Sequence, residues 1–305
     1  MSDSMNKLTI VANAGRSGST YLYSLLKNSL AENVYVAHED IPVQVSKPRV
    51  YNRAYSKKRI AEVLGDSLLF DYIKRWKEEL INRDVIETGW TCYHLLPVFA
   101  EVFGDALQVV VLHRNPWGVA LSRANMGNFH PYSWYDDSHE VSPFDRYTIA
   151  PEFQEIWGSL NHAEKCLYWW YVVYREVDEF LEKNPTSPSI TISSNAIFRG
   201  DNLVLENFIS HKISSISSNV NETNPVSNAS RETYPIIDEY KSFSNHQIIN
   251  QYAKDRFNYD LRDFDLEKMA EKYAIPDKPI SRIRNKTRYW VYRREIGRSI
   301  KSLIK

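Results

Sequence analysis

The chain has little cysteine, no excess of either charge and no long apolar run. Two of its 305 residues are cysteines, Cys92 and Cys166; two thiols cannot form a disulfide framework, so we expect both to be reduced and buried. The 38 basic residues balance the 38 acidic ones, which gives no sign of a nucleic-acid footprint. The densest apolar run, 167–174, is far below the roughly 20 residues that span a bilayer. No signal peptide is recognised, and we expect a cytoplasmic protein.

The most specific pattern lies near the start of the chain. The apolar run 8–11 is followed by a polar turn with Gly15 and Gly18, and then by the amphipathic run 21–26. This order predicts a strand, a tight turn and a helix. Glycines let a backbone approach a ligand closely, and the first N–H groups of a helix have no internal partners. The turn therefore predicts a site for a phosphate or a phosphosulfate.

The turn differs from that of the nucleotide triphosphatases. Their loop places a lysine and a hydroxyl residue after the last glycine, and the hydroxyl holds magnesium. Here Ser19 and Thr20 follow Gly18, and the cation is Arg16. A guanidinium stays charged and grips two oxygens of an anion. The loop favours an anion handled without magnesium, and we expect no metal.

Strand-like and helix-like segments alternate along the rest of the chain. The strongest strand, 107–112, reads Leu-Gln-Val-Val-Val-Leu; we expect it to be buried on both faces and to be the central strand. Further strands are predicted at 33–37, 85–86 and 189–193. One or two helices are predicted within 56–83, and further helices at 95–103, 118–124 and 162–181. The alternation predicts an α/β fold, a three-layer, P-loop-like, doubly wound parallel sheet flanked by helices, with ligands at the carboxyl ends of the strands. We expect one domain over residues 1–280.

A second candidate anion site follows the 107–112 strand. The strand runs into His113-Arg114-Asn115-Pro116, and Ser122 lies eight residues beyond Arg114 on the next predicted helix. An arginine at a strand end and a serine on the following helix can close on one phosphate from two sides. Taken alone, the pair is better explained by an arginine paired with a carboxylate and a serine near a helix start than by a functional site.

Together, the two motifs resemble those of the sulfotransferases that use 3′-phosphoadenosine 5′-phosphosulfate (PAPS). The resemblance covers about residues 8–125 and extends more weakly to the tryptophans at 169–170. It implies that Arg114 and Ser122 hold the 3′-phosphate of the nucleotide. It also implies that the first loop cradles the 5′-phosphosulfate, a role that falls to Gly15, Arg16, Ser17, Gly18, Ser19 and Thr20.

The chain departs from this family at the position of the base. In the branch that acts on phenols and steroids, the strand before the 107–112 strand ends in Lys-Thr-His, and the histidine is the base; here Glu87 and Gly89 replace the lysine and the histidine. Branches that modify carbohydrates or protein tyrosines use a glutamate. By this resemblance Glu39, which ends an extended segment, is our first choice of base, and Glu87 and His38 are alternatives that are equally open to a structural role. The histidines interpreted as non-catalytic are His94, His130 and His139.

Three further segments bear on the acceptor. The stretch 127–158 is rich in aromatic residues and carboxylates, which suit a sugar, although these residues are also typical of a small additional core. The serine- and asparagine-rich stretch 210–233 predicts a lid, in which Arg231 offers a further phosphate contact. Residues 281–305 hold nine basic residues against the single acid Glu295 and predict a basic amphipathic helix, which either packs on the core or lies on an anionic membrane surface.

The favoured function is a PAPS-dependent sulfotransferase of the bacterial carbohydrate-type branch. The expected partners are the nucleotide and a carbohydrate or glycolipid acceptor, with no nucleic acid and with peripheral contact to the inner face of the membrane through residues 281–305. Two alternatives remain open. One is a P-loop small-molecule kinase or nucleotide triphosphatase, which the missing Gly-Lys-Ser/Thr disfavours. The other is a non-catalytic glycan- or membrane-binding protein with a relic nucleotide pocket.

Overall fold

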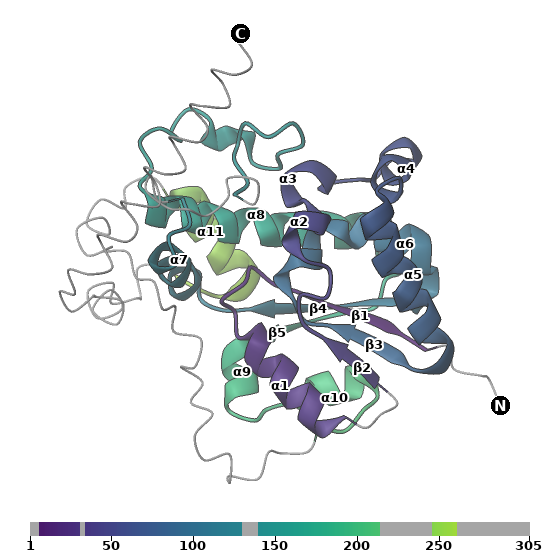
Figure 1. Ribbon diagram of the computed structural model, residues 1–305. Coiled ribbons are helices and arrows are strands. Elements are labelled where there is room, and N and C mark those ends of the chain that lie inside the picture. Colours follow the sequence, from purple (N-terminus) through teal and green to yellow (C-terminus); the bar gives the residue numbers. More distant parts are fainter. Residues whose placement is uncertain (1–5, 31–33, 130–139, 214–245, 261–305) are drawn as a thin grey trace, which may run out of the picture.

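The fold is built on one parallel sheet. The computed structural model describes residues 6–30, 34–129, 140–213 and 246–260. Its five strands lie in the order β2-β3-β1-β4-β5, and all neighbouring pairs are parallel (Figure 1). They are β1 (Leu8–Ala12), β2 (Val34–Ala37), β3 (Asp84–Glu87), β4 (Leu107–His113) and β5 (Ser189–Ser193). The predicted α/β fold is therefore confirmed, as a doubly wound parallel sheet flanked by helices.

Alternate residues of the strands enter two different cores. In β1, Leu8 and Ile10 belong to one buried cluster and Val11 belongs to the other. The second cluster also holds Leu22 of α1 (Ser19–Ser29) and Ile197 of α9 (Ser194–Phe198). Figure 1 shows α1, α9 and α10 (Leu203–Ile209) on one face of the sheet, with the remaining helices on the other. A sheet covered on both faces explains strands without a polar side.

The prediction that 107–112 forms the central strand was wrong. The structure places β1 in the middle of the sheet, with β4 beside it. All seven residues of β4 are buried, as predicted, because helices cover both of its faces. Burial from above and below does not depend on a central position, so an apolar run cannot by itself show which strand is in the centre.

The helices agree with the predicted segments in place and differ in detail. The segment 56–83 divides into α4 (Lys57–Leu64) and α5 (Ser67–Asn82), because Asp66 caps α5 through its side chain. The predicted helix 95–103 corresponds to α6 (Leu96–Phe103), which directly follows a 3-10 helix, η1 (Trp90–Leu95). The helices α7 (Pro116–Asn125) and α8 (His162–Lys183) match the two later predictions. Helices without a prediction are α2 (Val43–Ser46), α3 (Pro48–Tyr51), α9, α10 and α11 (Gln247–Phe257).

Part of the aromatic stretch 127–158 packs inward where the structure describes it, whereas Phe144 is exposed. Phe153 is buried in the main core, and Trp157 contacts both Phe129 and Tyr168 edge to face. Asp145 forms an ion pair with Arg49. The described part of the stretch thus supplies core and anchoring residues. Residues 130–139, most of 210–233 and all of 281–305, with His130, His139 and Arg231, lie outside the described residues.

Two other expectations concern burial. Both cysteines are free thiols and are buried, as predicted. Among the described helices, none combines the length and the apolar character that crossing a membrane requires.

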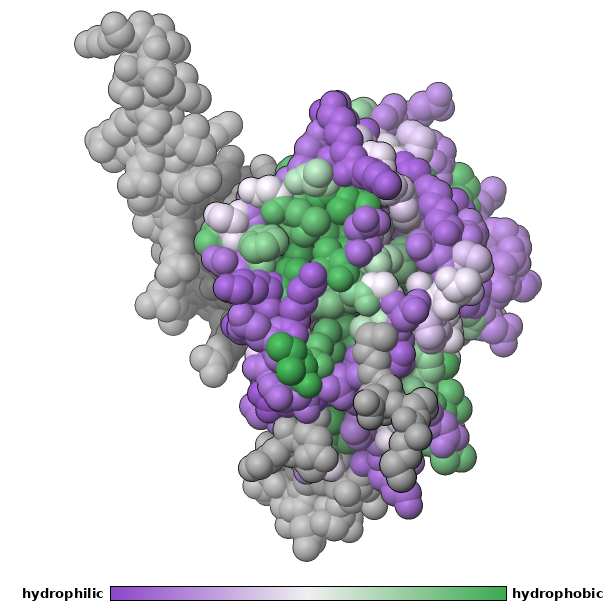
Figure 2. All heavy atoms as spheres, turned by 90° about the vertical axis from the view of Figure 1, so that its right-hand side faces the viewer, coloured by the Kyte–Doolittle hydropathy of each residue, from purple (hydrophilic) through white to green (hydrophobic). Residues whose placement is uncertain are grey.

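Figure 2 views the side of α4, α5 and α6, where the strands begin, and shows apolar residues in the middle of a hydrophilic surround. This apolar surface is distant from the carboxyl ends of the strands.

Candidate active site

The turn after β1 is a left-handed loop that leads into α1. Gly15, Arg16 and Gly18 have φ values of 68°, 54° and 85°. Glycine adopts this region without strain, whereas a residue with a Cβ atom does so at a cost of about 1–2 kcal/mol. The conformation of Arg16 is therefore held by its surroundings.

Asn13, which the sequence did not single out, ties the turn to β3. Its side-chain oxygen accepts a hydrogen bond from the Gly15 amide at 2.9 Å. Its side-chain nitrogen donates to the Thr88 carbonyl at 3.1 Å and to the Val11 carbonyl at 2.9 Å. An asparagine that bonds to a backbone two residues ahead is typical of tight turns. The sequence signal was its position as the first residue of the turn.

The start of α1 offers amide donors to an anion. Its N-cap is Gly18, which has no side chain to accept from the first amides. The hydroxyl of Ser17 donates to the Gly15 carbonyl at 3.1 Å and is turned back into the loop. A helix with an uncapped first turn concentrates N–H groups and the positive end of its dipole at one point. The residue types and the geometry of the loop thus fit a bound phosphate or sulfate group.

The two predicted motifs meet in space. Arg16 Nε donates to Ser122 Oγ at 2.8 Å, and Arg114 donates through Nη1 to the Arg16 carbonyl at 3.0 Å. Ser122 lies on α7, whose first turn is capped by the Asn115 side chain. The carboxyl ends of β1 and β4 are neighbours in the sheet, and this brings the two segments together. The structure thus assembles Arg16, Arg114 and Ser122 into one cluster.

A third arginine, Arg123, lies beneath the loop and was missed by the sequence analysis. Its guanidinium stacks on Trp169, 4.2 Å from the ring centre, and is 5.4 Å from that of Trp90. The side chain is 5% exposed, and its Nη1 donates to the Ala14 carbonyl at 3.4 Å. A Cβ atom at Gly15 would lie 3.1 Å from this nitrogen. The contacts join distant segments, so no local pattern could have identified Arg123.

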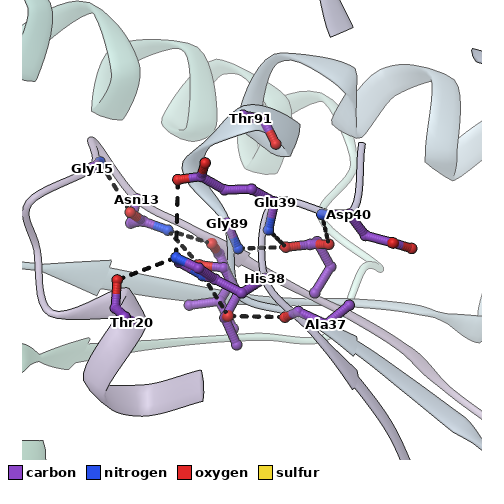
Figure 3. A network of polar contacts seen from close by, with 12 residues as sticks. Asn13, Gly15, Thr20, Ala37, His38, Glu39, Asp40, Gly89 and Thr91 are labelled. Carbon is purple, nitrogen blue, oxygen red and sulfur yellow. Dashed lines mark hydrogen bonds and ion pairs between the residues drawn. The ribbon is translucent and has the colours of Figure 1, made fainter. Parts of the chain in front are cut away.

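Glu39 lies beside this cluster. It follows β2 and has a left-handed backbone with φ 56°. Its side chain is 44% exposed and extends over His38 toward the turn at Gly15 (Figure 3). Burial raises the pKa of Glu39 above its usual value, while a hydrogen bond to Trp90 and the charges of Arg123 and Arg16 lower it. An accessible carboxylate next to a cationic loop is suited to accept a proton from a bound molecule.

Glu87, an alternative for the base, is enclosed by backbone. It is 0% exposed. Its Oε1 accepts from the amides of Glu39, at 2.8 Å, and Gly89, and its Oε2 accepts from the amide of Asp40 at 3.0 Å. Burial raises the pKa of Glu87 to about 7 against the opposing effect of these amides. Both oxygens are thus engaged within the protein.

His38, the other alternative, has both ring nitrogens engaged. The Thr88 hydroxyl donates to the Ala37 carbonyl at 2.9 Å, so its oxygen accepts from His38 Nδ1 at 3.0 Å. This leaves Nε2 to accept from the Thr20 hydroxyl at 3.2 Å. Burial lowers the pKa of His38, which favours this neutral form. The histidine therefore joins the start of α1 to the end of β3.

His94 is buried in the core, and its Nε2 donates to the Ser46 carbonyl at 2.7 Å. Burial lowers its pKa to about 4, so it is neutral at physiological pH. This contact joins η1 to α2 and lies among packed side chains. Within the described ranges, no three His, Cys, Asp or Glu side chains are grouped to hold a metal ion.

No protein-family model matches the chain, and no curated protein matches it. Solved structures do resemble it, among them the following three. The sulfotransferase domain from the curacin biosynthetic pathway is 11% identical, with a TM-score of 0.42 over 89% of this chain and 99% of that one. The sulfotransferase domain of the Synechococcus PCC 7002 olefin synthase is 14% identical, with a TM-score of 0.42 over 90% and 98%. A sulfotransferase from Alicyclobacillus acidocaldarius is 15% identical, with a TM-score of 0.40 over 91% and 98%.

Proposed function

We propose that this chain is a sulfotransferase that moves a sulfuryl group from PAPS to a hydroxyl of an acceptor. The observation that carries the proposal is the 2.8 Å hydrogen bond between Arg16 Nε and Ser122 Oγ. It joins the glycine turn after β1 to α7, the helix that follows Arg114 and Asn115 at the end of β4. A nucleotide with phosphate groups at both its 5′ and 3′ positions requires two adjacent anion sites of this kind.

The donor set fits such a nucleotide. The first-turn amides of α1, with the backbone of Gly15 to Gly18, would hold the 5′-phosphosulfate. Arg114 and Ser122 would hold the 3′-phosphate. The backbone of Arg16 belongs to the first group, and its guanidinium contacts Ser122 of the second group, so this residue links the two. Charge-assisted bonds from arginine are stronger than neutral ones, which suits a ligand with several negative charges.

The proposed base is Glu39. In the transfer, the bond from sulfur to the phosphate oxygen breaks, and a bond forms from sulfur to the acceptor oxygen. The acceptor proton goes to the Glu39 carboxylate, and adenosine 3′,5′-bisphosphate leaves. Arg16 and the loop amides would stabilise the charge that grows on the leaving phosphate. Glu87 and His38 are less suited, because backbone amides and two threonine hydroxyls engage their polar atoms.

We propose a carbohydrate or glycolipid hydroxyl as the acceptor, and a cytoplasmic protein of the carbohydrate-type branch. Support comes from Glu39 as the proposed base, since the branches of the family that modify carbohydrates use a glutamate in this role. Peripheral contact with the inner face of the membrane is part of the same prediction and depends on residues 281–305, which lie outside the described residues. PAPS is expected to bind without a metal.

A thermal-shift experiment tests the nucleotide. Adenosine 3′,5′-bisphosphate at about 100 times its dissociation constant should stabilise the protein by roughly 2.7 kcal/mol. The stabilisation should persist in EDTA, and ATP with magnesium should produce none. Stabilisation by magnesium-ATP alone would favour the kinase alternative. No response to either nucleotide would favour a non-catalytic protein.

A further inference from the structure

The carboxylate of Glu87 organises the turn that carries Glu39. With 0% of its surface exposed, Glu87 cannot contact an acceptor. It receives three backbone amides, from Glu39, Asp40 and Gly89. Only an ionised carboxylate offers acceptor sites on two oxygens and carries no proton of its own. The turn is therefore matched to a carboxylate rather than to an amide or a hydroxyl.

The turn needs such a contact because its backbone is strained. Glu39 has φ 56°, a region that residues with a Cβ atom seldom adopt. Such conformations persist where the surroundings determine them, and they cluster at functional sites. On one side, Gly89 approaches so closely that a Cβ atom there would lie 2.4 Å from Glu39 N. On the other side, Asp40 is anchored by Trp76 Nε1 at 2.8 Å and by Arg75.

We propose that Glu87 is a positioning residue, whose buried carboxylate holds the 38–40 turn in the one conformation from which Glu39 reaches the loop at Gly15. The inference rests on the proposed function in so far as Glu39 is the base. Figure 3 shows the arrangement, with the amides of Glu39, Asp40 and Gly89 directed at one carboxylate. A glutamine has one acceptor oxygen and would turn an NH₂ group toward donors, so Glu87→Gln should release the turn.

The surroundings of Glu87 support this role. The titratable groups that act on it or feel its charge include Asp40, Tyr35 and Cys92. Burial raises the pKa of Glu87 to about 7, so the carboxylate gains its proton as the pH falls through neutrality. The proton occupies an oxygen that otherwise accepts an amide. Glu39 should therefore be less firmly held at acidic pH.

Nuclear magnetic resonance tests the contact without any assay of function. In the deuterated, ¹⁵N-labelled full chain, the amide protons of Glu39, Asp40 and Gly89 should titrate together with a single midpoint. In Glu87→Gln this common titration should vanish. Three different midpoints in the wild type, or a common titration that persists in the variant, would overturn the proposal. The wild-type measurement decides even if the variant does not fold.

The positioning role is tested with PAPS as donor and water as acceptor, by following release of adenosine 3′,5′-bisphosphate. Because misplacing a reacting group by about 1 Å can cost roughly 100-fold, Glu87→Gln should slow release at least about tenfold. Its affinity for adenosine 3′,5′-bisphosphate should stay close to that of the wild type, because Glu87 bonds to the amides of Glu39, Asp40 and Gly89 and not to the proposed nucleotide donors. The matched control is Glu78→Gln, an exposed position on α5, which should change neither quantity.

An unchanged rate in Glu87→Gln, or a parallel loss of nucleotide affinity, would refute the positioning role. A wild-type protein that neither binds the bisphosphate nor releases it from PAPS would instead reject the proposed function. The amide titration is measured without nucleotide and would still decide whether Glu87 holds the turn. The two failures are therefore distinguishable.

Discussion

Arg16 Nε lies 2.8 Å from Ser122 Oγ, although 106 residues separate them in the chain. The contact crosses from the turn after β1 to α7, and Arg114 closes the same cluster by donating to the Arg16 carbonyl. Arginine and serine are ordinary residues at a loop and a helix surface. It is their convergence at the carboxyl ends of two adjacent parallel strands that indicates a site for an anion with two charged ends.

Removing the serine hydroxyl tests this cluster. Ser122→Ala should weaken binding of adenosine 3′,5′-bisphosphate by about 0.5–1.5 kcal/mol, or roughly two- to tenfold, since one hydrogen bond is lost. Arg114→Ala should cost more, about 1.5–3 kcal/mol, because its bonds are charge-assisted. Isothermal titration calorimetry measures both. Ser159→Ala, in an exposed turn whose hydroxyl donates to Ile156, is the control. Unchanged affinity in both site variants would place the nucleotide elsewhere.

Glu39→Gln tests the base. The amide cannot take the acceptor proton, so the rate of transfer should fall by about 10²–10⁴. Affinity for the nucleotide should change little, because Glu39 is not among the proposed nucleotide donors. Release of adenosine 3′,5′-bisphosphate from PAPS gives the rate, and calorimetry gives the affinity. If the variant turned over at the wild-type rate, Glu39 would not be the base, and His38 would be the remaining candidate.

Gly89→Ala tests the close approach of the two turns. The added Cβ atom would meet Glu39 N at 2.4 Å and Glu39 Cα at 2.7 Å, and backbone atoms cannot move aside as a flexible side chain would. We expect a loss of about 1–3 kcal/mol in the free energy of unfolding, as in other overpacked sites. Turnover should fall as well, since Glu39 must shift.

Urea denaturation measures the change in stability. Gly158 offers a matched glycine, because nothing lies within 4 Å of a Cβ atom there. Gly158→Ala should therefore be neutral or slightly stabilising. Equal effects of the two substitutions would contradict the proposed crowding at Gly89.

A buried acid outside the site predicts a pH dependence of stability. Glu176 on α8 accepts from the Asn52 side chain at 3.3 Å, and burial raises its pKa to about 8 from an ordinary value of 4.5. Between these two values the folded state binds more protons than the unfolded state, so this group makes stability fall as the pH rises. The slope is at most about 1.4 kcal/mol per pH unit.

The comparison variant is Glu176→Gln, which has no proton to lose. Urea denaturation of both proteins between pH 6 and 9 should show the fall in the wild type and a flatter curve in the variant. Parallel curves would show that Glu176 is already ionised in the folded protein. The position is remote from the loop, so nucleotide binding should be the same in both proteins at pH 7.

Local patterns predicted most elements correctly, and their failures have physical causes. The β-branched apolar run 107–112 predicted β4 and its burial on both faces. It did not show that β1 is the centre, because strand order follows from the crossovers. For the aromatic residues of 127–158 the sequence left a sugar site and a small additional core open. Phe153 and Trp157 pack inward, and residues 130–139 lie outside the described residues. Aromatic side chains are common both in cores and in binding clefts, so the residue type alone does not distinguish the two.

By itself, the amino-acid sequence determined the parallel α/β fold, the glycine turn after the first strand and the residues of the Arg-Asn-Pro segment, because these depend on local conformation and on the period of apolar residues. The tertiary structure alone decided which of these residues meet. It joined Arg16 to Ser122, placed Arg123 against two tryptophans and enclosed Glu87 while leaving Glu39 accessible. Contacts between residues so far apart in the chain, 106 positions for Arg16 and Ser122, depend on strand order and packing, which no local stretch of sequence encodes.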